Sequence, residues 1–466
     1  MFQANKYTVA TTPKLLFGSH LVSGIIFTIS AAMTTPASAL SLTDALALAR
    51  RSDPQFLSAQ ANHAATRERS NQAFGALLPQ LSLTANTTSN RRQYDTLNST
   101  LPTTDETYNS NGGQLNLNQH IWHSASRAAV TQAEATLTQA QYQLALAEQD
   151  LLVRLAQAWF DAMVARDTVT FSDRQEEATR YQWEQARRAV ENGLATGPML
   201  EEARTKYDQA LADQAGAATD LSIKLAALEQ IIGTITSVPS SYLTVDFLAK
   251  DPRGKTLEQW LAEAEANNPG VLAAINALDA ANEEVRKQEA GHEPTLDAVA
   301  SYGRNAQTAG SFPGQNGYDI RLFSVGVQLN VPLYSGGTQN AKVREAVALQ
   351  DKATQDLESA KRNARLMVKQ AWFTWHAGFA RQTAALQANK FSTLTLQAAA
   401  KGKASGVKTE LDVLQARQQL SSAARDLQKA RYDMITSHLK LQAAVGQLAD
   451  VDLISLDTSL APAGDQ

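Results

Sequence analysis

The feature that most constrains the fold is an apolar repeat of seven residues near the end of the chain. Its apolar positions are Val413, Leu420, Leu427, Met434 and Leu441. A second set, mostly of small residues, follows three positions later in each repeat, at Ala416, Ala423, Ala430, Ser437 and Ala444. A period of 3.5 residues is typical of helices that supercoil left-handedly around a neighbour. The small residues of the second set let two backbones come close. This pattern predicts a long coiled-coil helix over residues 408–446.

A less regular copy of this seam lies 213 residues earlier. It comprises Leu200, Tyr207, Gln214, Leu221 and Leu228, with Ala203, Ala210, Ala217, Lys224 and Ile231. Other landmarks recur at nearly the same offset, namely Asp53-Pro54 with Asn268-Pro269, Pro79 with Pro294, and Trp159-Phe160 with Trp372-Phe373. Such agreement predicts a duplicated chain. We expect a first structural repeat over residues 40–233, a linker over 234–254, a second repeat over 255–446 and a polar C-terminal tail over 447–466.

The first 39 residues differ in character from the rest. Lys6 and Lys14 precede an apolar run from Leu21 to Met33, and small residues follow up to Ala39. This order predicts a secretory signal peptide over residues 1–39. The alternative is a membrane anchor, but the run is shorter than the ~20 apolar residues that a spanning helix needs. The predicted mature protein is therefore exported.

Composition excludes several classes of function. The chain has no cysteine, which excludes disulfides, thiol nucleophiles, cysteine-bound zinc and a lipid anchor on cysteine. Its net charge of −4 and mixed surface charges do not suit nucleic acid. His120 and His123 are three residues apart, and on a strand that spacing places them on opposite faces, so we expect no metal site. No catalytic residue pair, phosphate loop or cofactor motif is present, and we predict a protein that is not an enzyme.

Each repeat follows the order helix, strand, strand, long helix, turn, long helix. Four segments alternate apolar and polar residues, as half-buried strands do, and they cover residues 81–90, 114–122, 295–304 and 321–333. Long helices are predicted where breakers are almost absent, over residues 123–192, 198–232, 338–402 and 408–446. A helix of about 68 residues is ~100 Å long.

The four alternating segments have the length and pattern of membrane β-strands. A small periplasmic β-domain, or strands half-buried against the helices, are the alternatives. Four strands cannot close a membrane barrel, because the smallest have about eight and an open edge in lipid is prohibitive. We therefore expect an oligomer, and a trimer supplies twelve strands. Its charged helices would stay outside the lipid and close as a hollow cylinder, with a narrow packed bundle as the alternative.

Three junctions stand out, namely the LLPQL segment at Leu77–Leu81, the strand exit at Val331–Gly337 and the helix start at Gly406–Leu414. Together with the duplicated order of helices and strands, they resemble those of the TolC family of trimeric outer-membrane channels. The resemblance implies a mainly α protein with membrane β-strands, a homotrimer whose twelve-stranded outer-membrane β-barrel continues as a periplasmic α-helical coiled-coil barrel. It implies an exit duct in the outer membrane lipid, with a large periplasmic portion, for a tripartite efflux or type I secretion system. Its partners are then a periplasmic adaptor protein and an inner-membrane ABC or proton-driven transporter.

The lack of cysteine fits the branch of the family that serves type I secretion. The alternative function is a periplasmic or surface coiled-coil structural protein.

The resemblance also implies a gate at the periplasmic mouth. Asp412 matches an acidic ring of the family, Lys408 matches a basic residue of its lock, and Gln415 stands where a second Asp is frequent. Pro198, Lys403 and Met199 replace the other lock residues, which implies a closed state that is held differently or more weakly. Three carboxylates ~6 Å apart repel one another by roughly 0.7 kcal/mol per pair even in water, which raises their pKa and favours bound cations. The alternative is that Asp412 complements the helix dipole behind a Thr409 N-cap.

The turns between the long helices contain Gly193, Gly197, Gly402 and Gly406. The resemblance implies that these turns contact the adaptor. Simple helix termination is the alternative explanation for the glycines.

Overall fold

The computed structural model describes residues 40–95, 97, 103–234, 242–243, 254–312, 314–458 and 460–461. These residues belong to one compact unit that begins at Ala39. The predicted signal peptide and most of the predicted linker lie outside the described residues.

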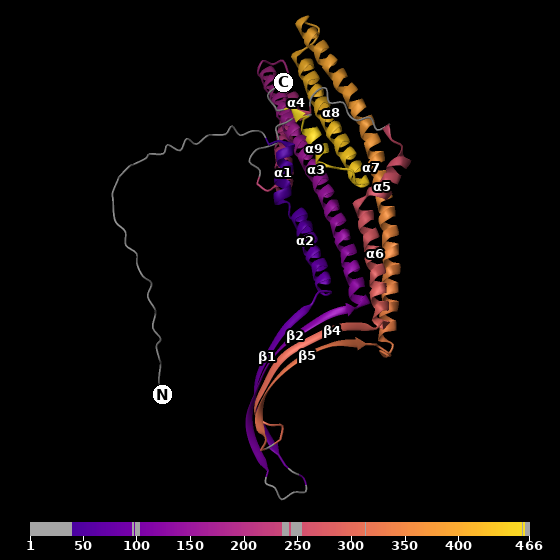
Figure 1. The fold of residues 1–466 in the computed structure, drawn as a ribbon. Helices are drawn as coiled ribbons and strands as arrows, with labels where there is room; N and C mark the ends of the chain where they lie inside the picture. The colour runs from indigo at the N-terminus through magenta and orange to yellow at the C-terminus, as the bar shows by residue number, and fades with distance from the viewer. Residues whose placement is uncertain are drawn as a thin grey trace, which may run out of the picture. The chain divides into compact units, whose positions relative to one another are not determined.

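The two repeats contain matching helices and strands (Figure 1). The first repeat has α1 (Leu42–Ser52), α2 (Pro54–Gly75), β1 (Gln80–Tyr94), β2 (Thr104–Trp122), α3 (Ser124–Glu191) and α4 (Gly197–Ile232). The second has α5 (Leu257–Asn267), α6 (Pro269–Glu289), a 3-10 turn (Ala290–His292), β4 (Thr295–Ala309), β5 (Asn316–Asn330), α7 (Thr338–Ala404) and α8 (Glu410–Val445). Outside the repeats lie β3 (Tyr242–Leu243), α9 (Asp450–Asp457) and β6 (Leu460–Ala461). The four long helices begin and end within two residues of the predicted positions.

The strands differ more from the prediction, because β1 and β2 continue beyond the predicted segments 81–90 and 114–122. Pairing runs outward to Tyr94 and Thr104, although these ends are rich in Asn, Thr and Ser. Polar cross-strand contacts support the extension, since Thr87 Oγ1 donates to Asn111 Oδ1 over 2.8 Å. At the other edge β5 ends at Asn330 rather than at residue 333. Pro332 has no backbone N–H to donate to a neighbouring strand, and β5 ends two residues before it.

Proline and an N-cap residue split the first helical segment of each repeat. Asp53 accepts a hydrogen bond from the Phe56 N–H and caps α2, and Asn268 accepts from the Val271 N–H and caps α6. Both cap residues are buried. The carboxylate of Asp53 also accepts two hydrogen bonds from the guanidinium of Arg154 on α3, over 2.9 and 3.2 Å. The two repeats therefore use one backbone motif with a charged cap in the first and a neutral cap in the second.

The main core lies where α3 and α8 cross beside α1, α5 and α9. Phe160 of α3 stacks on Tyr432 of α8 with ring centroids 5.2 Å apart, and both side chains are buried. The C-terminal segment belongs to this core, since Leu453 of α9 is fully buried. Asp457 accepts a hydrogen bond from the Leu42 N–H at the start of α1 over 3.0 Å. The expectation of a polar tail was therefore wrong for residues 450–457, because Leu453 and Leu456 pack on the core and the carboxylates of Asp450 and Asp457 bind α1.

The strands of both repeats form one antiparallel sheet in the order β1-β2-β4-β5 (Figure 1). A row of opposed residues crosses all four strands, namely Leu83, Leu115, Tyr302 and Phe323. The next row towards the helices is Leu81, Leu117, Ala300 and Val325. Rows two residues apart share a face, so these side chains form one apolar face. None of the described helices is both long enough and apolar enough to span a membrane.

Candidate functional site

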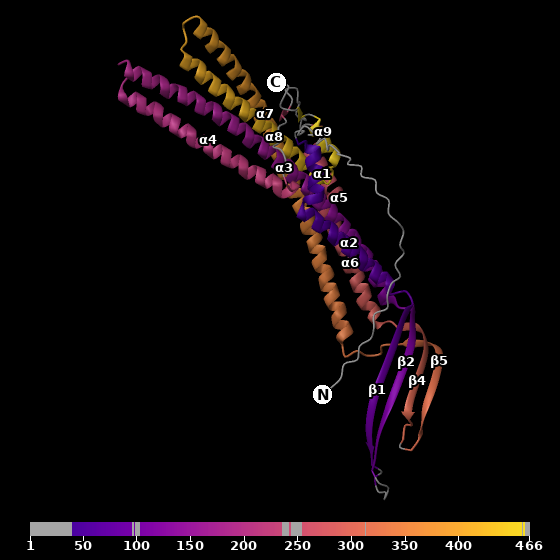
Figure 2. The same cartoon turned by 90° about the vertical axis from the view of Figure 1, so that its left-hand side faces the viewer.

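The long helices form two hairpins, α3 with α4 and α7 with α8, which separate towards their turns (Figure 2). Both turns end their first helix in the same way. Gly193 and Gly406 have φ values of 69° and 75°, and the following Leu194 and Val407 donate backbone hydrogen bonds to Ala189 and Gly402. This six-residue closure is the Schellman motif, in which glycine meets the left-handed conformation without strain. The glycines therefore have a structural role at these turns whether or not a partner binds there.

Gly197 and Gly402 have different environments. Gly197 begins α4 with open space around it, whereas a Cβ on Gly402 would lie 2.6 Å from the Lys408 Cγ atom. The sequence pattern did not distinguish these two glycines from the two that adopt positive φ.

Asp412 lies in the first turn of α8 and forms a capping box with Thr409. Its Oδ2 atom accepts hydrogen bonds from the Thr409 N–H and hydroxyl, each over 2.8 Å, and Thr409 Oγ1 accepts from the Asp412 N–H. Lys408 Nζ lies 3.4 Å from the Asp412 Oδ1 atom. Of the three predicted gate residues, the fold thus brings together Lys408 and Asp412.

The hydrogen bonds from Thr409, first from its N–H and then from its hydroxyl, lower the pKa of Asp412 below its ordinary value, and Lys408 adds to this effect. Within one chain the direction is therefore opposite to the rise expected from a ring of carboxylates, because the helix cap stabilises the ionised form. The rise stays a prediction about an assembly of several chains.

The residues around Lys408 differ from the expected lock. Gln415 is exposed one turn beyond Asp412. Lys403 forms an ion pair with Glu410 across the turn. Met199 borders a cavity of about 420 Å³ together with Thr409 and Glu410. Met199 therefore lies across from the start of α8, where a thioether can pack but cannot form a charged link.

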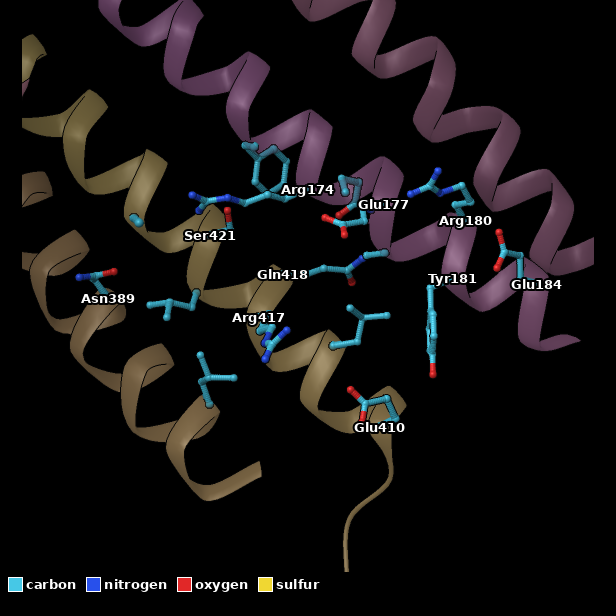
Figure 3. A pocket seen from close by; sticks show the side chains of 17 residues that line it. Arg174, Glu177, Arg180, Tyr181, Glu184, Asn389, Glu410, Arg417, Gln418 and Ser421 are labelled. Carbon is cyan, nitrogen blue, oxygen red and sulfur yellow. The ribbon is translucent and has the colours of Figure 1, made fainter. Parts of the chain in front are cut away.

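A larger cavity of about 840 Å³ lies between α3, α7 and α8 (Figure 3). Its wall carries charged side chains from facing helices, namely Arg174, Glu177, Arg180 and Glu184 of α3, with Glu410 and Arg417 of α8. Gln418 Nε2 and Asn389 Oδ1 are buried without a hydrogen-bond partner among the described residues. Sequence reasoning missed this site. The available signal was the set of charged residues beside the α8 seam, but only tertiary structure shows which of them face α3.

The two histidines lie closer together than expected. Their ring centroids are 4.8 Å apart, because His123 lies beyond β2 and caps α3 through its Nδ1 atom. The expectation that they occupy opposite faces of a strand was therefore wrong. His120 Nδ1 lies 2.5 Å from Asp297 Oδ1 on β4, which links two strands near the helices. Over the described residues, no group of three or more His, Cys, Asp or Glu side chains is placed to hold a metal ion.

The apolar face of the sheet is open to solvent in the single chain. Phe323, Val325 and Leu83 are each 70–74% exposed. The outer strands β1 and β5 each pair with one neighbour among the described strands. A soluble protein rarely exposes such a large apolar surface or such long strand edges. The apolar face and the outer strands of this sheet are therefore unlike those of most soluble proteins.

Comparisons with known proteins agree with this geometry. The sequence pattern of the family described as "Outer membrane efflux protein" matches residues 45–234 and 260–447. The chain is 31% identical over 437 residues to the outer membrane protein TolC of Vibrio cholerae, covering 93% of this chain and 97% of that protein. It is 30% identical over 425 residues to the alkaline protease secretion protein AprF of Pseudomonas aeruginosa, covering 89% of this chain and 86% of that protein. The CmeC outer membrane channel of Campylobacter jejuni has a similar fold, with a TM-score of 0.72 and 16% sequence identity. The match covers 90% of this chain and 89% of that channel.

Proposed function

This chain belongs to the outer membrane efflux protein family and forms an outer-membrane exit duct, and from that premise we propose that three copies build one duct. The observation that carries this proposal is the four-stranded sheet, which has one apolar face and whose outer strands β1 and β5 each have one edge without a partner among the described strands. Strand β5 of one copy would pair with β1 of the next, which gives twelve strands in three copies. Pairing would cover the backbone groups of both edges, which cannot remain unpaired in lipid.

We further propose that the helical hairpins continue this barrel into the periplasm as a tunnel. The turns at Gly193–Gly197 and Gly402–Gly406 would then lie at the far end of the tunnel, away from the sheet. Leu194 and Val407 are 83% and 80% exposed at these turns, so each turn offers an apolar side chain to a partner. We assign these turns to a periplasmic adaptor, which would connect the duct to an inner-membrane transporter. Relatives named for protease secretion and for efflux support both kinds of cargo system.

The gate in this proposal is a ring of three Asp412 side chains at the periplasmic mouth. The Thr409 hydrogen bonds keep each carboxylate ionised, and Lys408 partly offsets its charge. Ionised carboxylates brought close together bind divalent cations, because the cation removes their mutual repulsion.

The assembly is tested by fractionating the cell envelope and comparing heated with unheated samples on gels. A duct should appear in the outer-membrane fraction as an oligomer that dissociates on heating. Release of a monomer by osmotic shock would instead support a coiled-coil structural protein, which the comparisons do not favour.

The gate is tested by the conductance of single ducts in planar bilayers. We expect Asp412→Asn to weaken block by divalent cations about tenfold or more, because it removes the ring charge but keeps an acceptor for the cap. Asp426→Asn is the matched control, since Asp426 occupies the same heptad position about 21 Å further along α8. Equal block in the wild type and in Asp412→Asn would remove Asp412 from the gate.

A further inference from the structure

One row of the sheet departs from the apolar pattern of its face. The row comprises Ala85, Gly113, Arg304 and Arg321, and it follows the row of Tyr302 and Phe323 on the side away from the helices. Rows two residues apart share a face, so both arginines extend from the face that carries the apolar side chains. Tyr302 and Phe323 therefore mark the end of the apolar band, and the next row on this face contains the two arginines.

Arg304 and Arg321 are directly opposite each other on β4 and β5. Directly opposed residues have Cβ atoms about 4.5–5.5 Å apart, and like charges in this arrangement destabilise a sheet. Asp319 binds Arg304 through two hydrogen bonds, from Nε over 2.9 Å and from Nη2 over 2.7 Å. No carboxylate of the described chain lies within ion-pair distance of Arg321, although its charge also attracts Asp319. The pair thus keeps a net positive charge with one guanidinium available.

The neighbouring strands leave space beside this pair. A side chain on Gly113 would meet no atom within 4 Å, and Ala85 adds only a methyl group on β1. The side chain of Arg304 is more than half exposed. Arg321 is exposed as well, so a ligand headgroup can approach both guanidinium groups from the membrane side.

We infer that Arg304 and Arg321 bind the phosphate of a phosphorylated glycolipid in the outer leaflet of the outer membrane. This inference rests on the proposed barrel, in which the helices occupy the periplasmic side and the arginines lie at the opposite boundary. Tyr302 and Phe323 mark that boundary, because aromatic girdles of membrane barrels lie where lipid meets water. Guanidinium groups bind phosphate oxygens bidentately, and one phosphate between two opposed arginines removes their repulsion. Departure from a local pairing rule is expected where a site is functional.

The test uses the mature full-length protein, purified in detergent and titrated with lipid A that carries two phosphates. Native mass spectra count the lipid A molecules that remain bound to the oligomer. We expect the double variant R304Q/R321Q to bind lipid A at least about tenfold more weakly, since it loses charge-assisted hydrogen bonds. Lipid A stripped of its phosphates should bind the wild type as weakly as intact lipid A binds the double variant. R91Q is the matched control, because Arg91 lies on the same face, six residues further out on β1.

A second readout separates binding from folding. Without lipid A, R321Q should unfold at a temperature equal to or above that of the wild type, because the like-charge repulsion is gone. The inference is overturned if R304Q/R321Q retains lipid A like the wild type, or if R91Q loses as much binding. A wild type that forms no heat-sensitive oligomer would instead contradict the proposed barrel.

Discussion

Asp53 makes two separable contributions to stability, and two substitutions distinguish them. Its side chain is only 2% exposed. The carboxylate caps α2 through the Phe56 N–H over 2.8 Å and binds the guanidinium of Arg154 through both oxygens. Asn can keep the cap and lose the charge, whereas Ala loses both.

The expected magnitudes follow from these contacts. Loss of an N-cap costs about 1 kcal/mol, and breaking a buried ion pair from one side costs about 3–5 kcal/mol. The second cost is lower here, because the Arg154 side chain is 27% exposed and keeps Asp150 as a partner over 2.6 Å. We therefore expect Asp53→Ala to lower the free energy of unfolding by about 2–3 kcal/mol. Asp53→Asn should lower it by about 1 kcal/mol, since Asn caps helices as well as Asp does.

The difference between wild type and Asp53→Asn should depend on pH. Burial alone would raise the pKa of Asp53, but the hydrogen bonds from Arg154 and from the Phe56 N–H outweigh burial and hold this pKa below its ordinary value of 3.8. A lowered pKa in the folded state contributes stability above the unfolded pKa, and this contribution is lost as pH falls through the folded pKa. The two proteins should therefore differ fully at neutral pH and converge below about pH 4.

The assay is guanidinium unfolding of the mature protein in detergent, followed by the far-ultraviolet helix signal at fixed protein concentration. Asn268→Asp is the control at the equivalent position of the second repeat. There the Asn268 amide donates to the Ala444 carbonyl over 2.8 Å, so a carboxylate loses that bond and should destabilise the protein at neutral pH. Equal losses for Asp53→Asn and Asp53→Ala, or no pH dependence of the difference, would refute the assignment of a separate charge contribution.

Two further substitutions test the membrane face and the helical turn. Val325→Arg should cost about 2–4 kcal/mol and reduce the heat-sensitive oligomer in the outer-membrane fraction, because it places a charge on the lipid face. Ser324→Arg, on the opposite face, should leave the oligomer intact, and equal loss in both variants would contradict the assignment of faces. Gly406→Ala should lower the unfolding free energy by about 1–2 kcal/mol, since φ is 75° there. Gly197→Ala is the control without a positive φ, and thermal unfolding midpoints that fall equally in both would argue against strain at Gly406.

Sequence alone predicted much of the fold, because the signals that define these elements are local. The heptad seam at Val413–Leu441 and the scarcity of glycine and proline located the long helices, since helix continuation depends on neighbouring residues. The Asp53-Pro54 and Asn268-Pro269 pairs marked the helix breaks, because a cap and a proline act within one turn. Alternation of apolar and polar residues predicted the strands and their lipid face.

Tertiary structure decided what depends on residues distant in sequence. The polar ends of β1 and β2 remain strands because each supplies the other with hydrogen-bond partners, which composition does not reveal. Helix α9 docks because Asp457 meets the start of α1, more than 400 residues away in the chain. The register between β4 and β5 sets Arg304 opposite Arg321, and a shift of one residue would send one of them to the other face. Local chemistry thus determined the helices and strands, whereas contacts between distant parts of the chain determined which side chains meet.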